Sequence, residues 1–410
     1  MHVFTSITAN YIPKAAALAH SVKRVHPEAT FHLVISDDMP ECPPAVVEAF
    51  DSIINVRDLP IPELPRFLFR HRIVELCTAV KGTAFQHIAD VHGAERIYYF
   101  DPDIIVTNRL DDLERALDES SILLTPHSIA PETDPQAMID NERCCLRNGV
   151  YNLGFLAVKM DENGRKFIDW WADRLLRWCY DETAAGLFTD QRWVDLGPAL
   201  FDGVKILRDP QYNVSTWNLT HRRATGQAPY DIAINGRPLV FYHFSGFDSG
   251  AQRMMLDRYG SHSPVLYEFR EWYLEECRRF GQETIGKIPC IYTRYKSGAK
   301  IPDVHRTIYR EREDLMRYFA DPFDDAKPET SFPHWYEVHG KGETGQATTQ
   351  PAAEIVEPTP ASVIEAPVEI TAPAEASPNL RKLIRSHAPE PAVKAYHSVR
   401  AALRRLSKVE

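Results

Sequence analysis

The sequence lacks several features that would assign it to a class of proteins at once. Its 410 residues contain no stretch of about 18 to 20 consecutive apolar residues, the length that a membrane-spanning helix needs. The seven cysteines include no Cys-x-x-Cys pair, the spacing typical of zinc sites and redox-active disulfides. The N-terminal segment shows no basic flank followed by an apolar core, as a signal peptide would. We therefore expect a cytoplasmic protein with reduced thiols.

An excess of positive charge is also missing. Lysine and arginine together number 47, against 57 aspartates and glutamates, and the formal net charge is −10. A nucleic-acid-binding domain normally presents a basic face, so no nucleic-acid partner is expected. What the sequence does have is an ordinary globular composition, 44% hydrophobic, in a chain long enough to bury a large core.

Short apolar strands alternate with helical patterns along the first 250 residues. Residues 2–8 and 30–38 are typical of buried strands, and residues 13–25 between them carry Ala, Leu and Val at helical spacing. This alternation predicts an α/β fold with a mostly parallel sheet flanked by helices. Ligands bind such sheets at the carboxyl ends of the strands.

Composition divides the chain into four predicted parts. The α/β pattern fills residues 1–250, and a mostly helical extension follows over residues 251–340. Residues 341–378 are rich in Pro, Ala and Glu and predict a disordered linker. Residues 379–410 are basic and amphipathic; this pattern is typical of a segment that contacts an anionic membrane surface or a partner protein, and also of a solvated chain end.

Two carboxylates stand at the end of the apolar run "YYFDPDIIV". Asp101 and Asp103 flank Pro102, which fixes its own φ and so limits the backbone freedom of the turn. Paired carboxylates offer hard oxygen ligands to Mg²⁺ or Mn²⁺. The same pattern is also typical of two solvated acids in a turn, so the motif alone leaves both interpretations open.

Further short motifs accompany this one in a fixed order. They are "TSITANYIPKAAALAHSV", "AVKGTAFQHI", "YNLGFLAVK", "TDQRW" and "YHFSG". Together with "YYFDPDIIV", and over about residues 1–250, they resemble the retaining nucleotide-sugar glycosyltransferases of the Rossmann-like GT-A fold, family eight. That family includes glycogenin and bacterial lipopolysaccharide galactosyltransferases. The resemblance implies a transferase that takes a nucleotide-sugar donor, most simply a UDP-sugar, and a divalent cation.

The resemblance also implies which residues form the metal site. Asp101 and Asp103 match the motif that holds Mn²⁺ or Mg²⁺ on the donor's diphosphate. His243 matches a histidine that completes the site from a distant strand. A cation held there would act as a Lewis acid on the leaving diphosphate.

Other matching positions are implied to contact the sugar. Asn152 and Gly154 match an Asn-x-Gly element that faces the transferred sugar, and Asp190 and Gln191 match an Asp-Gln pair beside the anomeric carbon. The family retains anomeric configuration. Asp190 is the candidate nucleophile for a double displacement, but we favour a same-face displacement assisted by the leaving group, with Gln191 as a polar support.

Four further residues are expected at the nucleotide. Asn10 and Tyr11 follow the first strand, where the nucleoside is expected, and an acid at the end of the second strand, Asp37 or Asp38, could accept a hydrogen bond from it. Lys81 is a candidate for steadying the diphosphate.

One departure from the family pattern follows Gly246, which is itself expected at the donor. The family motif usually runs on to a lysine that touches the phosphates, whereas Phe247 and Asp248 stand here. Lys81, Arg253 or another cation would have to take that task.

Other functions remain open at this stage. A non-catalytic protein that binds sugar nucleotides or glycans would keep the same motifs. A phosphohydrolase of the haloacid dehalogenase type would phosphorylate Asp101, but Ile105 stands where Thr or Val is usual. A nucleotidyltransferase would want a glycine-rich loop after the first strand, and "TANYIPKAAA" has none. We favour transfer of a sugar to a saccharide or glycolipid acceptor in cell-surface polysaccharide or lipopolysaccharide synthesis.

Overall fold

A computed structural model describes residues 1–345, which fold as one compact unit. Its centre is a seven-stranded sheet in the order β10-β6-β7-β4-β1-β2-β3. Within this sheet β7 alone runs opposite to its neighbours, pairing antiparallel with β4 and β6. The strands are β1 (His2–Ile7), β2 (Thr30–Ile35), β3 (Ser52–Asn55), β4 (Arg96–Phe100), β6 (Ile122–Pro126), β7 (Tyr151–Lys159) and β10 (Val204–Ile206).

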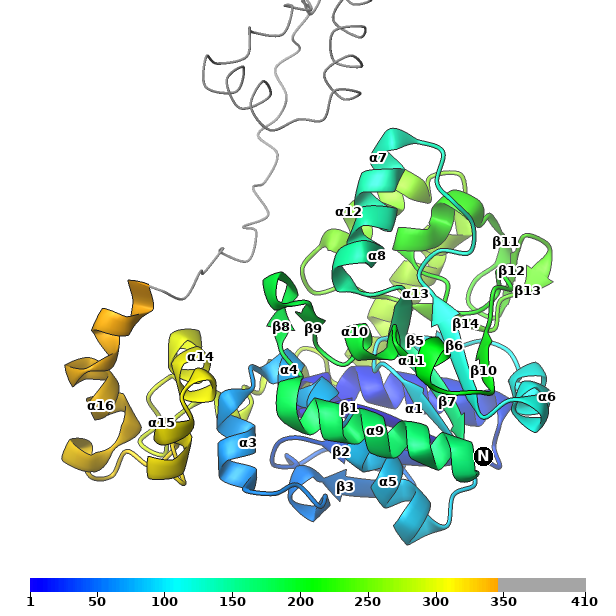
Figure 1. Cartoon of the computed structure of the whole chain (residues 1–410). Coiled ribbons are helices and arrows are strands. Elements are labelled where there is room, and N and C mark those ends of the chain that lie inside the picture. The colour runs from blue at the N-terminus through cyan, green and yellow to red at the C-terminus, as the bar shows by residue number, and fades with distance from the viewer. Residues whose placement is uncertain (346–410) are drawn as a thin grey trace, which may run out of the picture. The chain divides into compact units, whose positions relative to one another are not determined.

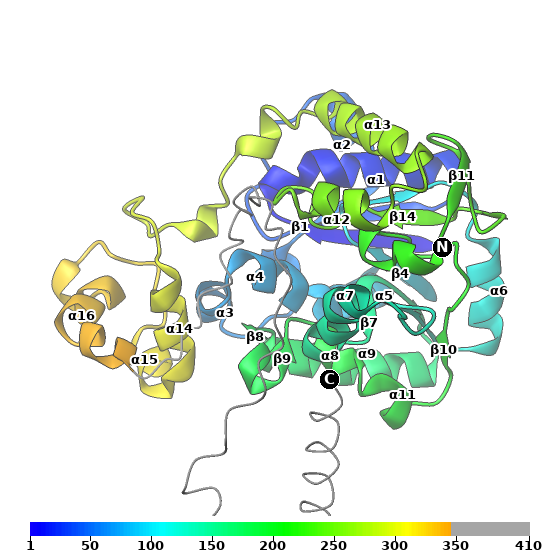
Figure 2. The same ribbon diagram turned by 90° about the horizontal axis from the view of Figure 1, so that it is seen from above.

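Helices cover both faces of the sheet, as Figure 2 shows from above. One face packs against α1 (Ile12–Val25), α6 (Asp111–Glu119) and α13 (Val265–Arg279). The other packs against α4 (Ile73–Ala79), α5 (Lys81–His92) and α9 (Glu162–Trp178). Side chains alternate along β1 accordingly, because Val3 belongs to the first core and Phe4 to the second. The expected mostly parallel sheet flanked by helices is confirmed.

Local sequence explains where the flanking helices begin. Pro13 stands in the first turn of α1, where its missing N–H costs no helical hydrogen bond. Alanines 15–17 and Ala19 then let α1 lie close against the sheet. At the start of α9, Asp161 Oδ1 accepts a hydrogen bond from the Gly164 N–H at 2.9 Å, a typical N-cap.

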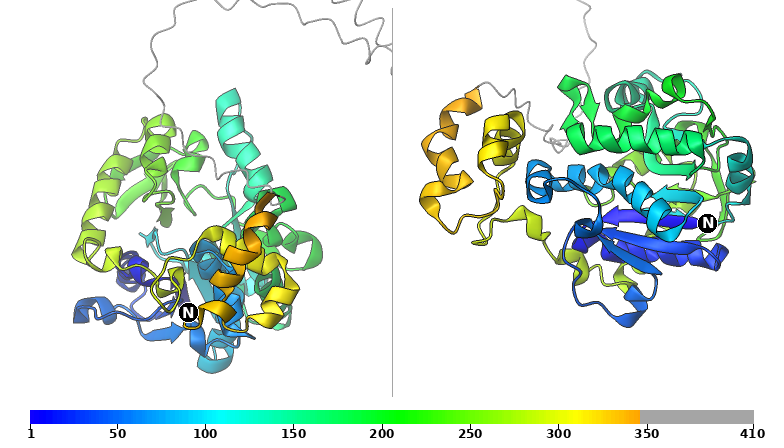
Figure 3. Two further views of the ribbon diagram at one scale, coloured as in Figure 1. Left: turned by 90° about the vertical axis from the view of Figure 1, so that its left-hand side faces the viewer. Right: turned by 60° about the horizontal axis from the view of Figure 1, so that its bottom comes forward.

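The remaining helices form two groups. α12 (Ala251–Tyr259) and α13 pack beside the sheet, and α14 (Asp303–Glu311), α15 (Glu313–Tyr318) and α16 (Phe332–Val338) cluster near α3 (Leu64–Arg70), as Figures 1 and 3 show. The shorter helices are α2 (Pro44–Val47), α7 (Pro135–Ala137), α8 (Arg143–Asn148), α10 (Gln191–Val194) and α11 (Gly197–Leu200).

None of the helices within residues 1–345 is long and apolar enough to cross a membrane. The predicted tail 379–410, and all but the start of the predicted linker 341–378, lie outside the described residues.

Small antiparallel pairings complete the structure. β5 (Ile104–Val106) pairs with β14 (Phe241–His243), and His243 stands opposite Ile104. This pairing joins segments about 140 residues apart in the chain at the carboxyl end of β4. The other small strands are β8 (Asp181–Glu182), β9 (Leu187–Phe188), β11 (Ala224–Gln227), β12 (Asp231–Ile234) and β13 (Arg237–Pro238).

Candidate active site

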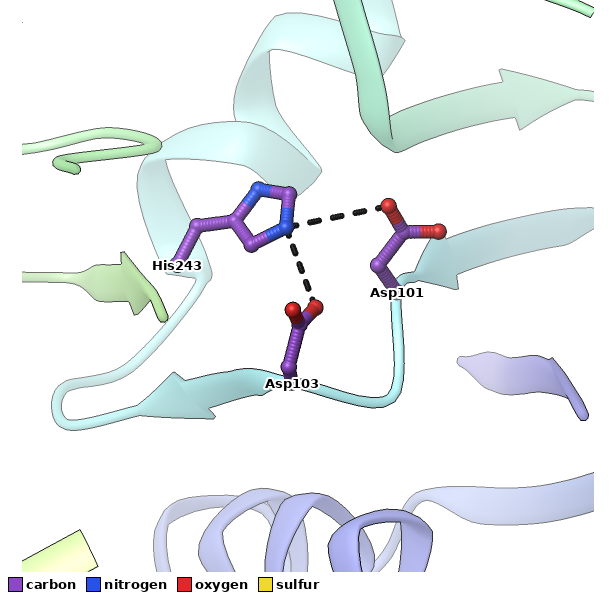
Figure 4. Close-up of side chains that lie close together, drawn as sticks. All are labelled: Asp101, Asp103 and His243. Carbon is purple, nitrogen blue, oxygen red and sulfur yellow. Dashed lines mark ion pairs between the residues drawn. The ribbon is translucent and has the colours of Figure 1, made fainter. Parts of the chain in front are cut away.

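Two carboxylates and one imidazole converge where β4 ends. Asp101 and Asp103 lie in the turn between β4 and β5, and β14 brings His243 beside them (Figure 4). His243 Nε2 is 3.0 Å from Asp103 Oδ1 and 3.7 Å from Asp101 Oδ2. One ligand atom from each of the three residues lies within 4.8 Å of the others. The three predicted metal ligands are therefore neighbours in space.

Gly154 makes room for the imidazole. A Cβ atom at this position would lie 2.4 Å from His243 Cε1, far inside van der Waals contact. The Gly154 carbonyl also accepts a hydrogen bond from the Asp101 N–H at 2.8 Å. The glycine therefore supports the cluster from behind, and no direct contact with a donor is needed to explain it.

The chemistry of this donor set fits Mn²⁺ or Mg²⁺. Carboxylate oxygens are the ligands that hard divalent cations prefer, and an imidazole nitrogen is compatible with Mn²⁺. Burial would raise the pKa of Asp103, but the positive charges of His243 and Lys14 outweigh it and lower that pKa overall. Asp103 therefore stays ionised in its partly buried position, as a metal ligand must.

Lys81 lies directly behind the cluster and is already engaged. It is the first residue of α5, its side chain is 2% exposed, and its Nζ is 2.8 Å from Asp190 Oδ2 and 3.4 Å from Asp101 Oδ1. It also donates to the Leu153 carbonyl at 3.1 Å. Burial lowers the pKa of Lys81, but the two carboxylates outweigh this and raise it. Lys81 therefore binds two site carboxylates together.

The Asp190-Gln191 pair is held rigidly at the start of α10. Burial raises the pKa of Asp190, although the charge of Lys81 opposes the rise. Gln191 Oε1 accepts from the Leu153 N–H at 3.1 Å, and its Nε2 donates to the Asn148 carbonyl at 2.8 Å. The Gln191 amide is thus fixed by backbone groups of two different segments, which leaves one orientation for its side chain.

Asn152 belongs to a polar network that the sequence did not reveal. Its Oδ1 accepts hydrogen bonds from the Gly154 N–H and from Asn213 Nδ2, both at 3.0 Å, and its Nδ2 lies 3.1 Å from His127 Nε2. Burial lowers the pKa of His127 to about 4, so this imidazole is neutral at pH 7. Together these residues form a wall of neutral hydrogen-bonding groups.

Trp217 was also missed, and it links this wall to the metal ligands. Its ring contacts His243 edge-on at 5.2 Å between centroids and lies 5.8 Å from the ring of His127. The buried indole N–H has no hydrogen-bond partner among the described residues. No signal in the sequence places these residues here: Trp217 lies in a short 3-10 helix (Thr216–His221), Asn213 in the loop before it and His127 directly after β6.

The predicted nucleoside residues lie along the same edge of the sheet. Asn10 Oδ1 accepts from Thr8 Oγ1 at 2.7 Å in the loop after β1. Asp37 is buried and accepts from the Ala9 N–H at 3.1 Å, so it supports that loop. Asp38 is exposed and forms an ion pair with Arg57 at 2.7 Å.

Tyr11 and Gly246 flank another ion pair. Tyr11 donates from its hydroxyl to Asp248 at 2.6 Å, and Lys14 Nζ lies 2.5 Å from the same carboxylate. Gly246 has φ +72° in the loop that carries Asp248. Lys14 was missed, although a lysine inside an alanine-rich helical stretch is a visible signal in the sequence.

No protein-family model matches this chain, but individual proteins are similar to it. Two uncharacterized proteins of Bacillus subtilis (strain 168) are similar in sequence. YfnF is 29% identical over 174 residues, which is 42% of this chain and 57% of YfnF. YfnD is 25% identical over 199 residues, which is 48% of this chain and 61% of YfnD. The chain thus spans less than two thirds of the length of either relative.

Solved structures similar to this chain include several described as glycosyltransferases. The galactosyltransferase LgtC, crystallised with donor and acceptor sugar analogs, is 16% identical, with a TM-score of 0.42 over 70% of this chain and 98% of LgtC. The glycosyltransferase GlyE of Streptococcus pneumoniae TIGR4 is 16% identical, with a TM-score of 0.38 over 72% of this chain and 66% of GlyE.

Proposed function

We propose that this protein is a metal-dependent glycosyltransferase that moves a sugar from a nucleotide-sugar donor, a UDP-sugar, to a saccharide or glycolipid acceptor. The observation that carries the proposal is the convergence of Asp101, Asp103 and His243 at the carboxyl end of β4. Ligand sites of parallel α/β sheets lie at that edge. The sequence motifs that resemble family eight supply the same three residues independently of the geometry.

The three ligands would hold Mn²⁺ or Mg²⁺ against the donor's diphosphate, and the bound cation would act as a Lewis acid that neutralises charge on the leaving group. Asp101 is held for this task by its own partners. Its Oδ1 accepts from the Tyr99 hydroxyl at 2.5 Å and lies 3.4 Å from Lys81 Nζ. These contacts direct its Oδ2 toward the position between Asp103 and His243.

The transferred sugar would meet Asn152, which belongs to the wall of neutral groups, and Gln191. Both side chains are buried and fixed by hydrogen bonds, so they would orient sugar hydroxyls without rearranging. Asp190 is paired with Lys81 at 2.8 Å, and attack on an anomeric carbon would require that buried pair to separate. This supports a same-face displacement with retention, in which the departing phosphate accepts the proton of the incoming hydroxyl.

We place this reaction in the cytoplasm, in the synthesis of a cell-surface polysaccharide or lipopolysaccharide. The motifs that resemble the family of bacterial lipopolysaccharide galactosyltransferases support this placement. A role for the basic residues 379–410 at a membrane or on a partner protein remains a prediction from the sequence.

Calorimetric titration of UDP tests the proposal. With Mn²⁺ we expect saturable binding, and we expect EDTA or Asp103→Asn to weaken it about 100-fold, equivalent to about 2.7 kcal/mol. Asp112→Asn is the matched control, because Asp112 lies on the exposed face of α6 and pairs there with Arg115. Thermal unfolding would show that both variants fold.

A positive titration leads directly to an activity assay, in which UDP-glucose and UDP-galactose are screened for hydrolysis and for transfer to saccharides. UDP binding that survives both EDTA and Asp103→Asn would contradict the metal site. An absence of UDP binding under every condition would contradict the UDP-sugar donor.

A further inference from the structure

Lys14 is a buried cation with an exposed partner. Its side chain is 3% exposed, whereas the carboxylate of Asp248, 2.5 Å from Lys14 Nζ, is 52% exposed. Among residues 1–345, Asp248 is the only ion-pair partner of Lys14. The Tyr11 ring lies under the ammonium at 4.2 Å, and the Tyr11 hydroxyl donates to the same carboxylate. One surface carboxylate therefore neutralises this buried ammonium.

The segment that supplies this carboxylate starts from the candidate metal site. Phe244 follows His243 directly, donates its N–H to the Asp103 carbonyl at 2.8 Å and stacks on Tyr273 at 4.0 Å. Gly246 and Gly250, with φ +72° and +78°, bracket the rest of the loop. The loop is therefore anchored at its first residue and exposed at Asp248, which can leave Lys14 without disturbing the metal ligands.

The other cations considered for the diphosphate are less suitable. Lys81 holds two site carboxylates and a carbonyl. Arg253 is half-exposed and pairs along its own helix with Asp257 at 2.9 Å. Lys14, in contrast, has only one ion-pair partner among residues 1–345, the surface carboxylate of Asp248, in the loop that follows the candidate metal ligand His243.

We propose that Lys14, beside the expected nucleoside residue Tyr11, forms an anion site for the donor's diphosphate, and that Asp248 occupies this site until the donor binds. The identity of the anion rests on the proposed function. A diphosphate arriving beside Asp103 would repel the Asp248 carboxylate. Asp248 can move fully into water at little cost because it is already half-exposed, whereas Lys14 cannot and needs a buried anion to replace it.

Titrations of two variants with three probes test this inference. The variants are Lys14→Met, which removes the ammonium and keeps the apolar stem, and Asp248→Asn, which removes the competing charge. The probes are UDP with Mn²⁺, inorganic pyrophosphate with Mg²⁺, and uridine. We expect Lys14→Met to weaken UDP and pyrophosphate binding about tenfold or more and to leave uridine binding unchanged. Asp248→Asn should strengthen binding of both anions about threefold or more.

Lys23→Met is the matched control, since Lys23 lies on the same helix and pairs with Asp51 at 2.5 Å on the surface. Equal pyrophosphate binding by the wild type and Lys14→Met, or no gain in Asp248→Asn, would overturn the anion site. If pyrophosphate binding responds as expected but UDP with Mn²⁺ does not bind, the anion site stands and the proposed donor fails. If neither anion binds any variant, both proposals fail.

Discussion

Glu75 and the Asp101–Asp103 pair are carboxylates drawn into the protein interior, and they differ in how fully their oxygens are satisfied. Glu75 is 1% exposed and lies 3.1 Å from Arg310, itself 2% exposed. Its oxygens also accept the N–H groups of Arg72 at 2.7 Å and Asp181 at 2.9 Å. This carboxylate is closed, because each oxygen is bonded and the compensating charge comes from the protein itself.

The Asp101–Asp103 pair is open by comparison. The two side chains are 28% and 18% exposed, and both direct an oxygen toward the same nitrogen of His243. The lysine nearest to them, Lys81, is shared with Asp190. The closed carboxylate of Glu75 therefore joins distant segments of the chain, whereas the open, partly buried pair keeps binding capacity for a cation.

Removing the partner of the closed carboxylate should have the largest effect. Arg310→Met leaves Glu75 buried without its counter-charge, which typically costs about 3–5 kcal/mol. We expect the free energy of unfolding, measured with urea, to fall by that amount. Mn²⁺-dependent UDP binding by the remaining folded protein should persist, because Arg310 lies outside the candidate active site.

Arg317→Met is the control for this substitution, since Arg317 is 79% exposed and pairs with Glu313 on the surface of α15. It should change stability by less than about 1 kcal/mol. If Arg310→Met is equally harmless, the Glu75 pair does not join α14 to the sheet domain as the comparison requires.

Closing the open pair sterically gives the second test. Gly154→Ala would place a methyl group 2.4 Å from His243 Cε1, so the imidazole must move away from Asp101 and Asp103. Overpacking of this kind costs as much as about 3 kcal/mol. We expect a lower melting temperature and a loss of Mn²⁺-dependent UDP binding of at least about tenfold, both measured on the same preparation.

A second glycine controls for the added methyl group. Gly197→Ala should be nearly neutral, because its nearest neighbour would be an atom of Phe167 at 3.6 Å, an ordinary contact. Wild-type UDP binding in Gly154→Ala would show that the position of His243 is unimportant for the cation.

The open pair was predictable from the sequence and the closed one was not. Asp101 and Asp103 end an apolar strand, and the alternation of strands and helices places strand ends at one edge of a sheet. Glu75 and Arg310 are 235 residues apart, and each is typical of a solvated helical residue when considered alone. Glu75 lies in α4 and Arg310 in α14, and only the tertiary fold brings these two helices together.

Among the polar residues of the candidate site, too, some could be predicted from the sequence and others could not. His243 could be assigned through a motif that the family resemblance supplies. The engagement of Lys81 by Asp190 and the contact of Asn213 with Asn152 depend on loops whose paths no local pattern specifies. A residue type at a strand end predicts where chemistry occurs, but the partners that tune it come from the tertiary fold.

Protonation of the buried His305 at low pH gives the smallest expected effect on stability. It is 6% exposed, and its Nδ1 lies 2.6 Å from the Tyr295 hydroxyl, beside the ring of Tyr336 at 4.1 Å. Burial lowers the pKa of His305 to about 4, although the charge of Glu337 opposes this. The folded protein therefore favours the neutral imidazole. Protonation would oppose the packing of α14 against α16.

Because the folded pKa lies below the unfolded value of about 6.5, this contribution to stability is complete above pH 6.5 and is lost as the pH falls toward 4. We expect the free energy of unfolding to drop by on the order of 2 kcal/mol over that interval through His305. His305→Gln should flatten this part of the urea-denaturation pH profile, whereas His339→Gln at an exposed position should leave it unchanged. Identical profiles for the wild type and His305→Gln would mean that the acid sensitivity lies in other histidines and that this contact tolerates charge.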